Sequence, residues 1–380
     1  MLKKIKLKKM FIELSPLIII LFATSLSAWG MNQEFEDLSL YGPKKYYPNR
    51  EKNDEGWIIK EIFLPTSIGN TDIRGHVFSF LDLQDLISAS RVSNGWEKVV
   101  KIELKNKPLA LSSRKLGITA TKKFFKANFP TLTKLNLSGN SLGAGGAENL
   151  SKANFPMLIT LNLEGNNIGK VGMGSLSKAT FPRLTLLILE GNNIGDTGAE
   201  RISKANFSAL TALYLGNNAL GDAGVGCISK ANFPALLALD LSYNRLTNPK
   251  SLFKANFSKL MMLNLNSNYQ LDFRGLGGLS RAFPQLNTLN LNDDKVGVVG
   301  AKSLSKADFS VITTLNLMQA DIGDAGAWCI SKCNFFMLTA LNLANNRIEN
   351  KGAEYLSKAN FPLLTLLNLE NNSIEDAGAD

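Results

Sequence analysis

The sequence is poor in the side chains on which most catalytic and metal sites depend. Its 380 residues include one histidine, His76, and three cysteines, Cys227, Cys329 and Cys333. Such a small set leaves almost no material for a histidine-based triad, a zinc site or a disulfide framework. Residues 28–105, which show no internal repetition, offer only His76, no cysteine and no glycine-rich phosphate loop. We therefore expect no enzyme activity, no catalytic residue, no metal site and no cofactor.

Acidic residues are scarce at the start of the chain, which carries much of the positive charge. The net charge of +10 falls to +6 when residues 1–27, with five lysines and one glutamate, are left out. These residues join a cationic start, MLKKIKLKKM, to the apolar stretch LSPLIIILFATSLSA, and Ser25 and Ser27 precede a cut at Ala28. The apolar stretch is shorter than the roughly 20 residues of a spanning helix. The pattern predicts a cleaved signal peptide and a secreted protein without membrane association. A retained anchor at the cell surface and a buried helix are the alternatives.

Residues 132–380 are built from one motif repeated at an almost fixed spacing. The pattern LxxLxLxxN recurs every 26 residues, with one spacing of 24. Its ten copies begin at Leu132, Leu158, Leu184, Leu210, Leu236, Leu260, Leu286, Ile312, Leu338 and Leu364. A weaker copy, at Leu109 and Leu111, lies one period before Leu135 and Leu137, and it predicts a degenerate first repeat over residues 106–131.

Each repeat joins a strand pattern to a helix-length segment. Leu135 and Leu137 alternate with Asn136, as a short strand requires, and segments such as GDTGAERISKANF start with an acid and end with a lysine. Strand followed by helix, repeated, predicts an α/β fold, a curved solenoid with a parallel sheet on its concave side and helices on its convex side. The repeats resemble leucine-rich repeats of the ribonuclease-inhibitor class. We expect Cys329 and Cys333, four residues apart, to share one helix.

Two more columns of the repeat indicate structural roles. Phenylalanine three residues before the first leucine predicts an aromatic core spine at Phe129, Phe155, Phe181, Phe207, Phe233, Phe257, Phe283, Phe309, Phe335 and Phe361. Asparagine closes the strand motif, where its amide can satisfy backbone groups of the turn, at Asn140, Asn166, Asn192, Asn218, Asn244, Asn268, Asn346 and Asn372. Asp294 and Ala320 interrupt the second column, which predicts looser turns there.

A third column consists of lysines three residues before the spine phenylalanines. Its members are Lys126, Lys152, Lys178, Lys204, Lys230, Lys254, Lys306, Lys332 and Lys358. A positive charge at the C-terminal turn of each helix complements the helix dipole. A stripe that binds polyanions is the alternative. Because no aromatic residues are interleaved with these lysines, we favour the dipole interpretation and expect no nucleic-acid partner.

The strand residue that faces away from the core is asparagine in seven of ten repeats. The three exceptions are consecutive, Ile188, Tyr214 and Asp240, and Leu186 lies beside them on the same face. An apolar and aromatic cluster with one acid, on a face otherwise lined with amides, suits the anchor residue of a protein partner. Neutral drift within one stretch of repeats is the alternative. We predict that an unidentified protein target binds the concave face at these four residues.

The segment before the repeats divides into a loop-like linker, residues 28–63, and a helical segment, residues 64–105. The helical segment could serve only as a cap on the first repeat. Its run HVFSFLDLQDLISASRVSNGW, however, resembles the F-box. The resemblance rests on the spacing of Val77, Phe78, Leu81, Asp85, Leu86, Val92 and Trp96.

An F-box joined to such repeats is also found in the GALA-type bacterial effectors, which this chain resembles through GAGGAENLS and GDAGAWCIS. The resemblance implies that Val77, Phe78, Leu81, Leu86, Val92 and Trp96 contact a Skp-family adaptor of a cullin ubiquitin ligase. It also implies that the repeats select the ligase's substrate, and the signal peptide would export the protein to act in a host cell. A secreted or surface adhesion protein, with a helical segment that only caps the solenoid, is the alternative.

Overall fold

The computed structural model describes residues 109–113, 116–126 and 129–375, all within the compact unit Leu104–Asp380. Eleven strands of these residues form one parallel sheet, in which each strand pairs with the next in sequence. The strands are β1 (Leu109–Ala110), β2 (Lys134–Asn136), β3 (Thr160–Asn162), β4 (Leu186–Ile188), β5 (Ala212–Tyr214), β6 (Ala238–Asp240), β7 (Met262–Asn264), β8 (Thr288–Asn290), β9 (Thr314–Asn316), β10 (Ala340–Asn342) and β11 (Leu366–Asn368).

Strand pairing keeps equivalent positions of successive repeats side by side. Leu135 of β2 pairs with Leu161 of β3, and the weaker copy of the motif pairs in the same way, with Leu109 opposite Leu135. The shorter spacing changes nothing here, because Leu239 of β6 still pairs with Leu263 of β7. One column of the sequence therefore becomes one row across the sheet.

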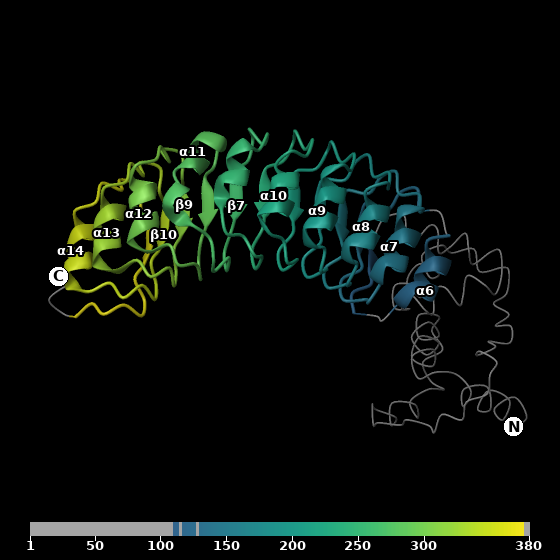
Figure 1. Cartoon of the computed structure of the whole chain (residues 1–380), viewed down its shortest axis with the longest axis horizontal. Helices are drawn as coiled ribbons and strands as arrows, with labels where there is room; N and C mark the ends of the chain where they lie inside the picture. The colour runs from purple at the N-terminus through teal and green to yellow at the C-terminus, as the bar shows by residue number, and fades with distance from the viewer. Residues whose placement is uncertain (1–108, 114–115, 127–128, 376–380) are drawn as a thin grey trace, which may run out of the picture. The chain divides into compact units, whose positions relative to one another are not determined.

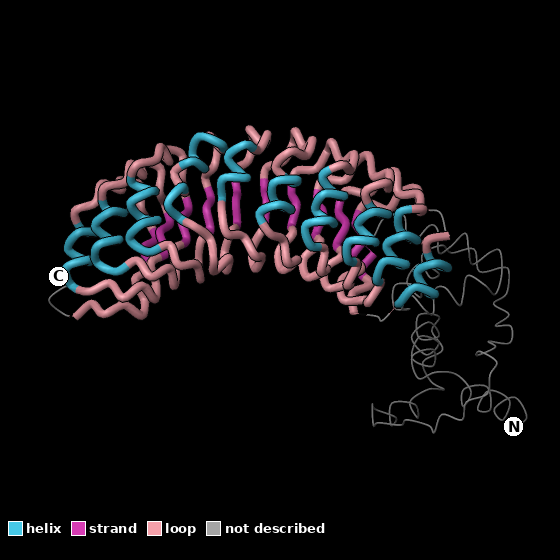
Figure 2. The backbone as a smooth tube through the Cα atoms, in the orientation of Figure 1, coloured by secondary structure: helices cyan, strands magenta, loops and turns pink. Residues whose placement is uncertain are grey.

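Helices lie on one side of the strands along the curved array (Figures 1 and 2). They are α6 (Gly117–Phe124), α7 (Gly143–Ser151), α8 (Gly169–Leu176), α9 (Gly195–Ser203), α10 (Asp222–Ile228), α12 (Gly297–Ser305), α13 (Gly323–Ser331) and α14 (Asn350–Ser357). The array thus has a helix face and a sheet face, which the sequence pattern assigned to the convex and concave sides. No helix in the described ranges has both the length and the apolar character needed to cross a membrane.

The core between sheet and helices contains the two kinds of residue that the repeat predicted. In β4 the burial alternates, with Leu187 buried between half-buried Leu186 and Ile188. The spine phenylalanines from Phe129 to Phe335 are buried, and the rings of Phe181 and Phe207 stack with centroids 6.2 Å apart. The predicted aromatic core is confirmed for these nine residues, whereas Phe361, in the last repeat, is only half-buried.

The closing asparagines form a buried ladder of hydrogen bonds between repeats. The Asn192 side-chain amide donates to the carbonyl oxygens of Leu163, at 2.8 Å, and Leu189, at 2.9 Å. Its Oδ1 accepts from the backbone N–H of Asn166 at 3.1 Å. Asn192 is fully buried, so each asparagine satisfies backbone groups that water cannot reach.

The two interruptions of the ladder change its hydrogen bonds, and one of them also changes the backbone of the turn. Ala320 offers no amide to the preceding turn, but the next residue, Asp321, keeps the left-handed φ of a regular repeat, 56° against 53° at Asn193. The N–H of Gly297 also reaches the carbonyl of Ala320 at 2.9 Å, as in regular repeats. Lys295, the residue after Asp294, does not have a left-handed φ, and the N–H of Val296 donates to the Asp294 carbonyl at 2.9 Å. The turn after Asp294 therefore departs from the regular backbone path, whereas the turn at Ala320 keeps it.

The helix prediction is wrong in the two repeats between Asp240 and Thr288. There the chain forms the 3₁₀ helices η3 (Pro249–Lys254) and η4 (Phe273–Gly275) and the five-residue helix α11 (Gly278–Ala282). Pro249 supplies no backbone N–H, and Asn248 accepts a hydrogen bond from the N–H of Lys250 at 3.0 Å, which starts η3. The shorter repeat has no room for a full helix, and the following GLGGL segment is rich in glycine, which disfavours one.

The ends of the regular helices lie where the lysine column predicts them. They also show that, contrary to the prediction from sequence, Cys329 and Cys333 do not share one helix. The residue that follows the helix is the column lysine in five repeats, namely Lys152, Lys204, Lys306, Lys332 and Lys358. Because α13 ends at Ser331, Cys329 lies on it and Cys333 lies two residues beyond its end. The Sγ of Cys333 still approaches the Cys329 carbonyl at 3.6 Å. The two cysteines are therefore neighbours without sharing a helix.

Candidate partner-binding surface

The asparagines of the sheet face perform a structural task. In all seven repeats that have one, the side-chain oxygen accepts a hydrogen bond from the backbone N–H two residues later; Asn162, for example, accepts from Glu164 at 2.9 Å. Asp240 keeps this bond, since its Oδ1 accepts from the N–H of Ser242 at 2.8 Å. Ile188 and Tyr214 cannot make it. At these two positions the local stabilising contact is therefore absent.

The structure brings the four predicted sheet-face residues together. Ile188, Tyr214 and Asp240 pair in register across β4, β5 and β6, and Leu186 lies in the adjoining row of β4. All four side chains are half-buried, so each presents part of its surface to solvent. Their proximity is confirmed, and their role in binding stays a prediction.

Three apolar residues that the sequence interpretation missed extend this surface. Leu237 and Met261, just before β6 and β7, are 37% and 39% exposed, and Met262 is half-buried. Six of the ten repeats have threonine at the position of Leu237, where Thr211 Oγ1 donates to the Thr185 carbonyl at 3.0 Å. The exposed apolar side chains at this position in two consecutive repeats, Leu237 and Met261, were the available signal.

We call this surface the sheet-face patch. Its apolar part consists of Leu186, Ile188, Tyr214, Leu237, Met261 and Met262. Its acidic part consists of Glu164, Glu190 and Asp240. A row of exposed apolar side chains bordered by charge is the usual composition of a protein-binding surface.

The acidic part of the patch lacks a neutralising cation. Asp240 Oδ2 accepts from Asn264 at 2.7 Å, and its Oδ1 accepts from the Ser242 hydroxyl at 2.6 Å. Neither Asp240 nor Glu190 forms an ion pair with a lysine or arginine of the described residues. Partial burial raises the pKa of Glu190, and the charges of Asp240 and Glu164 raise it further. Negative charge is thus concentrated without compensation.

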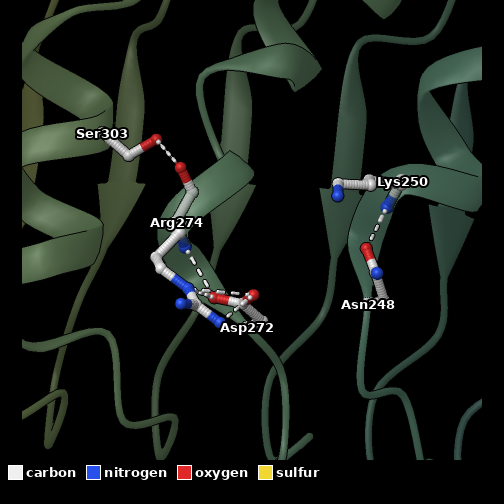
Figure 3. A network of polar contacts seen from close by, with 5 residues as sticks. All are labelled: Asn248, Lys250, Asp272, Arg274 and Ser303. Carbon is white, nitrogen blue, oxygen red and sulfur yellow. Dashed lines mark hydrogen bonds and ion pairs between the residues drawn. The ribbon is translucent and has the colours of Figure 1, made fainter.

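A hollow lies beside the N-terminal ends of η3 and η4, whose polar side chains are drawn in Figure 3. It measures about 410 Å³ and is lined by Asn248, Lys250, Asp272, Arg274 and Gly275. The Arg274 Nε lies 2.9 Å from the Asp272 Oδ1, which accepts the N–H of Arg274 as well. These charges satisfy each other, and no side chain here is paired with a base that would activate it. We regard the hollow as a consequence of the missing helices.

Metal and thiol chemistry find little support in the part of the chain that the structure covers. No group of three histidine, cysteine, aspartate or glutamate side chains there could hold a metal ion. Burial raises the pKa of the Cys333 thiol well above its ordinary value. A thiol that stays protonated is a poor nucleophile.

Family models match both parts of the sequence. The F-box domain matches residues 70–107. The Leucine Rich repeat matches residues 130–151, 156–177, 183–203, 209–229, 310–331 and 336–357. The F-box residues Val77, Phe78, Leu81, Leu86, Val92 and Trp96 lie outside the described residues. A search of curated proteins finds no match.

Comparison with solved structures finds similarities at low sequence identity. The TLR13–ssRNA13 complex is 20% identical, with a TM-score of 0.46, and the match covers 68% of this chain and 35% of that one. An internalin (inlF) from Listeria monocytogenes is 19% identical, with coverage of 77% and 90% and a TM-score of 0.43. The mouse RP105/MD-1 complex is 21% identical, with coverage of 67% and 44% and a TM-score of 0.43. The chain thus spans about a third of the TLR13 chain and under half of the RP105/MD-1 one. The sheet topology and the repeat matches establish an α/β leucine-rich-repeat solenoid.

Proposed function

We propose that this protein is a non-catalytic substrate receptor of an SCF-type ubiquitin ligase. Residues 70–107 bind a Skp-family adaptor of the cullin ligase, and the sheet face of the solenoid binds the protein to be modified. The observation that carries the proposal is the F-box match in the same chain as a repeat array. The first module joins a ligase, and the second offers a long surface for a target.

The sheet face suits the second task because it is continuous and locally distinct. Because the strands pair in parallel from β1 to β11, side chains at equivalent positions of successive repeats form a continuous row along the sheet face. Seven of these residues are asparagines bonded to their own backbone, whereas the sheet-face patch offers exposed apolar side chains and uncompensated carboxylates. Binding energy in protein interfaces is concentrated in such limited areas.

We also propose that the protein is exported and acts inside a host cell, as in the GALA-type effectors. The cationic and apolar pattern of residues 1–27 supports this proposal. Fusing residues 1–35 to a reporter enzyme that is active only outside the cytoplasm measures export. Reporter activity should disappear when the lysines of MLKKIKLKKM are replaced by glutamate, and activity that persists would contradict the assignment.

The adaptor interaction is tested directly with the full chain. Immobilised protein should retain a purified eukaryotic Skp-family adaptor, and Trp96→Ala and Leu81→Ala should each abolish retention. Trp328→Ala is the matched control, because Trp328 is a tryptophan of the solenoid, on α13, with 48% of its surface exposed. Its replacement should leave adaptor binding unchanged.

Two results would reject the adaptor role. The first is failure of the wild-type chain to retain any Skp-family adaptor under conditions in which a known F-box protein does so. The second is equal retention by wild type and Trp96→Ala. Either result would favour a secreted or surface-held binding protein, with residues 70–107 serving only to cap the repeats.

A further inference from the structure

The charge of the sheet-face patch is opposite to that of the whole protein. The chain has a net charge of +10. From β3 to β7, however, the outward strand positions and the positions two residues beyond each strand contain no lysine or arginine. The charged residues at these positions are Glu164, Glu190 and Asp240. A surface of this sign repels nucleic acid and attracts basic protein segments.

Gly216 lets two of the carboxylate side chains come close together. It is buried, two residues after the end of β5, and its φ is not left-handed, so backbone geometry does not require glycine here. A Cβ on Gly216 would lie 2.9 Å from Ser242 Oγ and 3.4 Å from both Asp240 Oδ1 and Glu190 Cγ. The space that a side chain would need is therefore already occupied, and the side chains of Glu190 and Asp240 converge on the glycine.

The apolar part of the patch adjoins these carboxylates. Tyr214, the last residue of β5, lies two residues before Gly216 and pairs with Asp240. Leu237 and Met261 lie toward the other end of β6 and β7 and are partly exposed. Methionine adapts its shape to different apolar partners, and an aromatic ring beside carboxylates can stack against a guanidinium group. Cationic and apolar side chains can thus be bound side by side.

We propose that the sheet-face patch binds a protein segment carrying an arginine or lysine beside apolar side chains, with the cation bound by the carboxylates of Glu190 and Asp240. The apolar side chains of the segment pack against Leu237, Met261 and Met262. This inference rests on the proposed function in taking the sheet face as the target-binding surface, and it adds the chemistry of the target.

Random peptides displayed on phage and selected on the full chain provide the test. Enriched peptides should contain arginine or lysine next to apolar residues. Their affinity should fall about tenfold or more with Glu190→Gln combined with Asp240→Asn, since each contact to a charged partner contributes strongly. Both replacements preserve size and keep one acceptor oxygen, which in Asp240→Asn can still accept from Ser242, while the new amide nitrogen replaces the oxygen that accepts from Asn264. Gly216→Leu, whose side chain would displace Ser242 and the two carboxylates, should weaken the same peptides.

Glu370→Gln is the matched control, because Glu370 occupies the equivalent position two residues after β11. It should leave peptide affinity unchanged, and thermal melting should show that every variant remains folded. Enrichment of peptides without basic residues, no enrichment at all, or affinity unaffected by the double replacement would overturn the proposal. Adaptor retention measured on the same double variant should equal wild type. Loss of peptide binding alone and loss of adaptor binding alone therefore identify which of the two proposals fails.

Discussion

The Asp294 Oδ1 accepts a hydrogen bond from the backbone N–H of Asn268 at 2.6 Å, the bond that an asparagine makes in neighbouring repeats. Its other oxygen, Oδ2, is buried without a partner, where asparagine would present an N–H₂ donor. Burial, and to a lesser extent the charge of Asp293, raises the pKa of Asp294 to about 8. A protonated carboxyl group at this position can donate one hydrogen bond in place of the amide.

We expect Asp294→Asn to stabilise the protein at neutral and alkaline pH. Between the ordinary value of 3.8 and about 8, the folded protein keeps a proton that the unfolded chain has released. The wild-type free energy of unfolding therefore falls as pH rises through this range, by an amount on the order of a few kcal/mol. The variant carries no such group and should lose this dependence. Urea unfolding at a series of pH values measures both.

Asp308→Asn is the control for this comparison. Asp308 is exposed, and its Oδ1 accepts only the N–H of Ser310, at 3.2 Å. Its replacement should leave the pH dependence as in wild type. If wild type and Asp294→Asn lose stability in parallel as the pH is raised, the buried carboxyl is charged and the asparagine analogy is wrong.

A second prediction concerns Tyr214, which cannot accept the hydrogen bond that a sheet-face asparagine accepts from the backbone N–H two residues later. Within the described residues the backbone N–H of Gly216 has no hydrogen-bond partner. Tyr214→Asn should supply one, as Asn162 does for Glu164, whereas Tyr214→Ala should not. Both variants lose the ring, so we expect the first to be more stable than the second by about 1 kcal/mol. Equal unfolding midpoints would contradict the structural role assigned to the sheet-face asparagines. Both variants should weaken target binding.

The sequence was enough to predict the architecture because, in a solenoid, equivalent positions of successive repeats lie side by side. A period of 26 residues fixes which strands pair, and alternation around Leu187 fixes which side chains enter the core. The ladder asparagines and the spine phenylalanines follow from the same logic. Of the candidate site, Leu186, Ile188, Tyr214 and Asp240 could be grouped from sequence, since the register alone places them together.

Other features depend on local geometry that the repeat pattern of the sequence does not show. Gly216 looks like an ordinary turn glycine in sequence, and only the distances from its missing Cβ to Ser242, Glu190 and Asp240 show that these side chains close in on it. Pro249 and the shorter repeat limit one helix to η3, and the glycines of the next repeat limit its helices to η4 and α11. Protonation of Asp294 depends on its burial, which sequence indicates only indirectly.

A third prediction uses two adjacent phenylalanines with opposite environments. Phe335 is 1% exposed and its ring lies 5.8 Å from that of Phe361, whereas Phe336 is 46% exposed. Phe335→Ala should cost about 3–5 kcal/mol, the usual result of emptying a packed aromatic site. Phe336→Ala should change stability by less than about 1 kcal/mol. Urea midpoints of the two variants test this, and similar losses would mean that the aromatic spine does not carry the packing assigned to it.

The final prediction compares two glycines on helix α8 that face different surroundings. A Cβ on Gly172 would lie 2.5 Å from Ile168 Cγ2 and 3.0 Å from the Cβ of Ala147 on the neighbouring helix, whereas a Cβ on Gly174 would meet nothing within 4 Å. Both residues are inside the helix, where alanine is favoured over glycine by about 0.5–1 kcal/mol. Gly174→Ala should therefore raise the unfolding midpoint. Gly172→Ala should lower it, at a cost of about 1–3 kcal/mol, because adjacent repeats must move apart. If both replacements stabilised the protein, the close approach of α7 and α8 would not be what requires glycine at position 172.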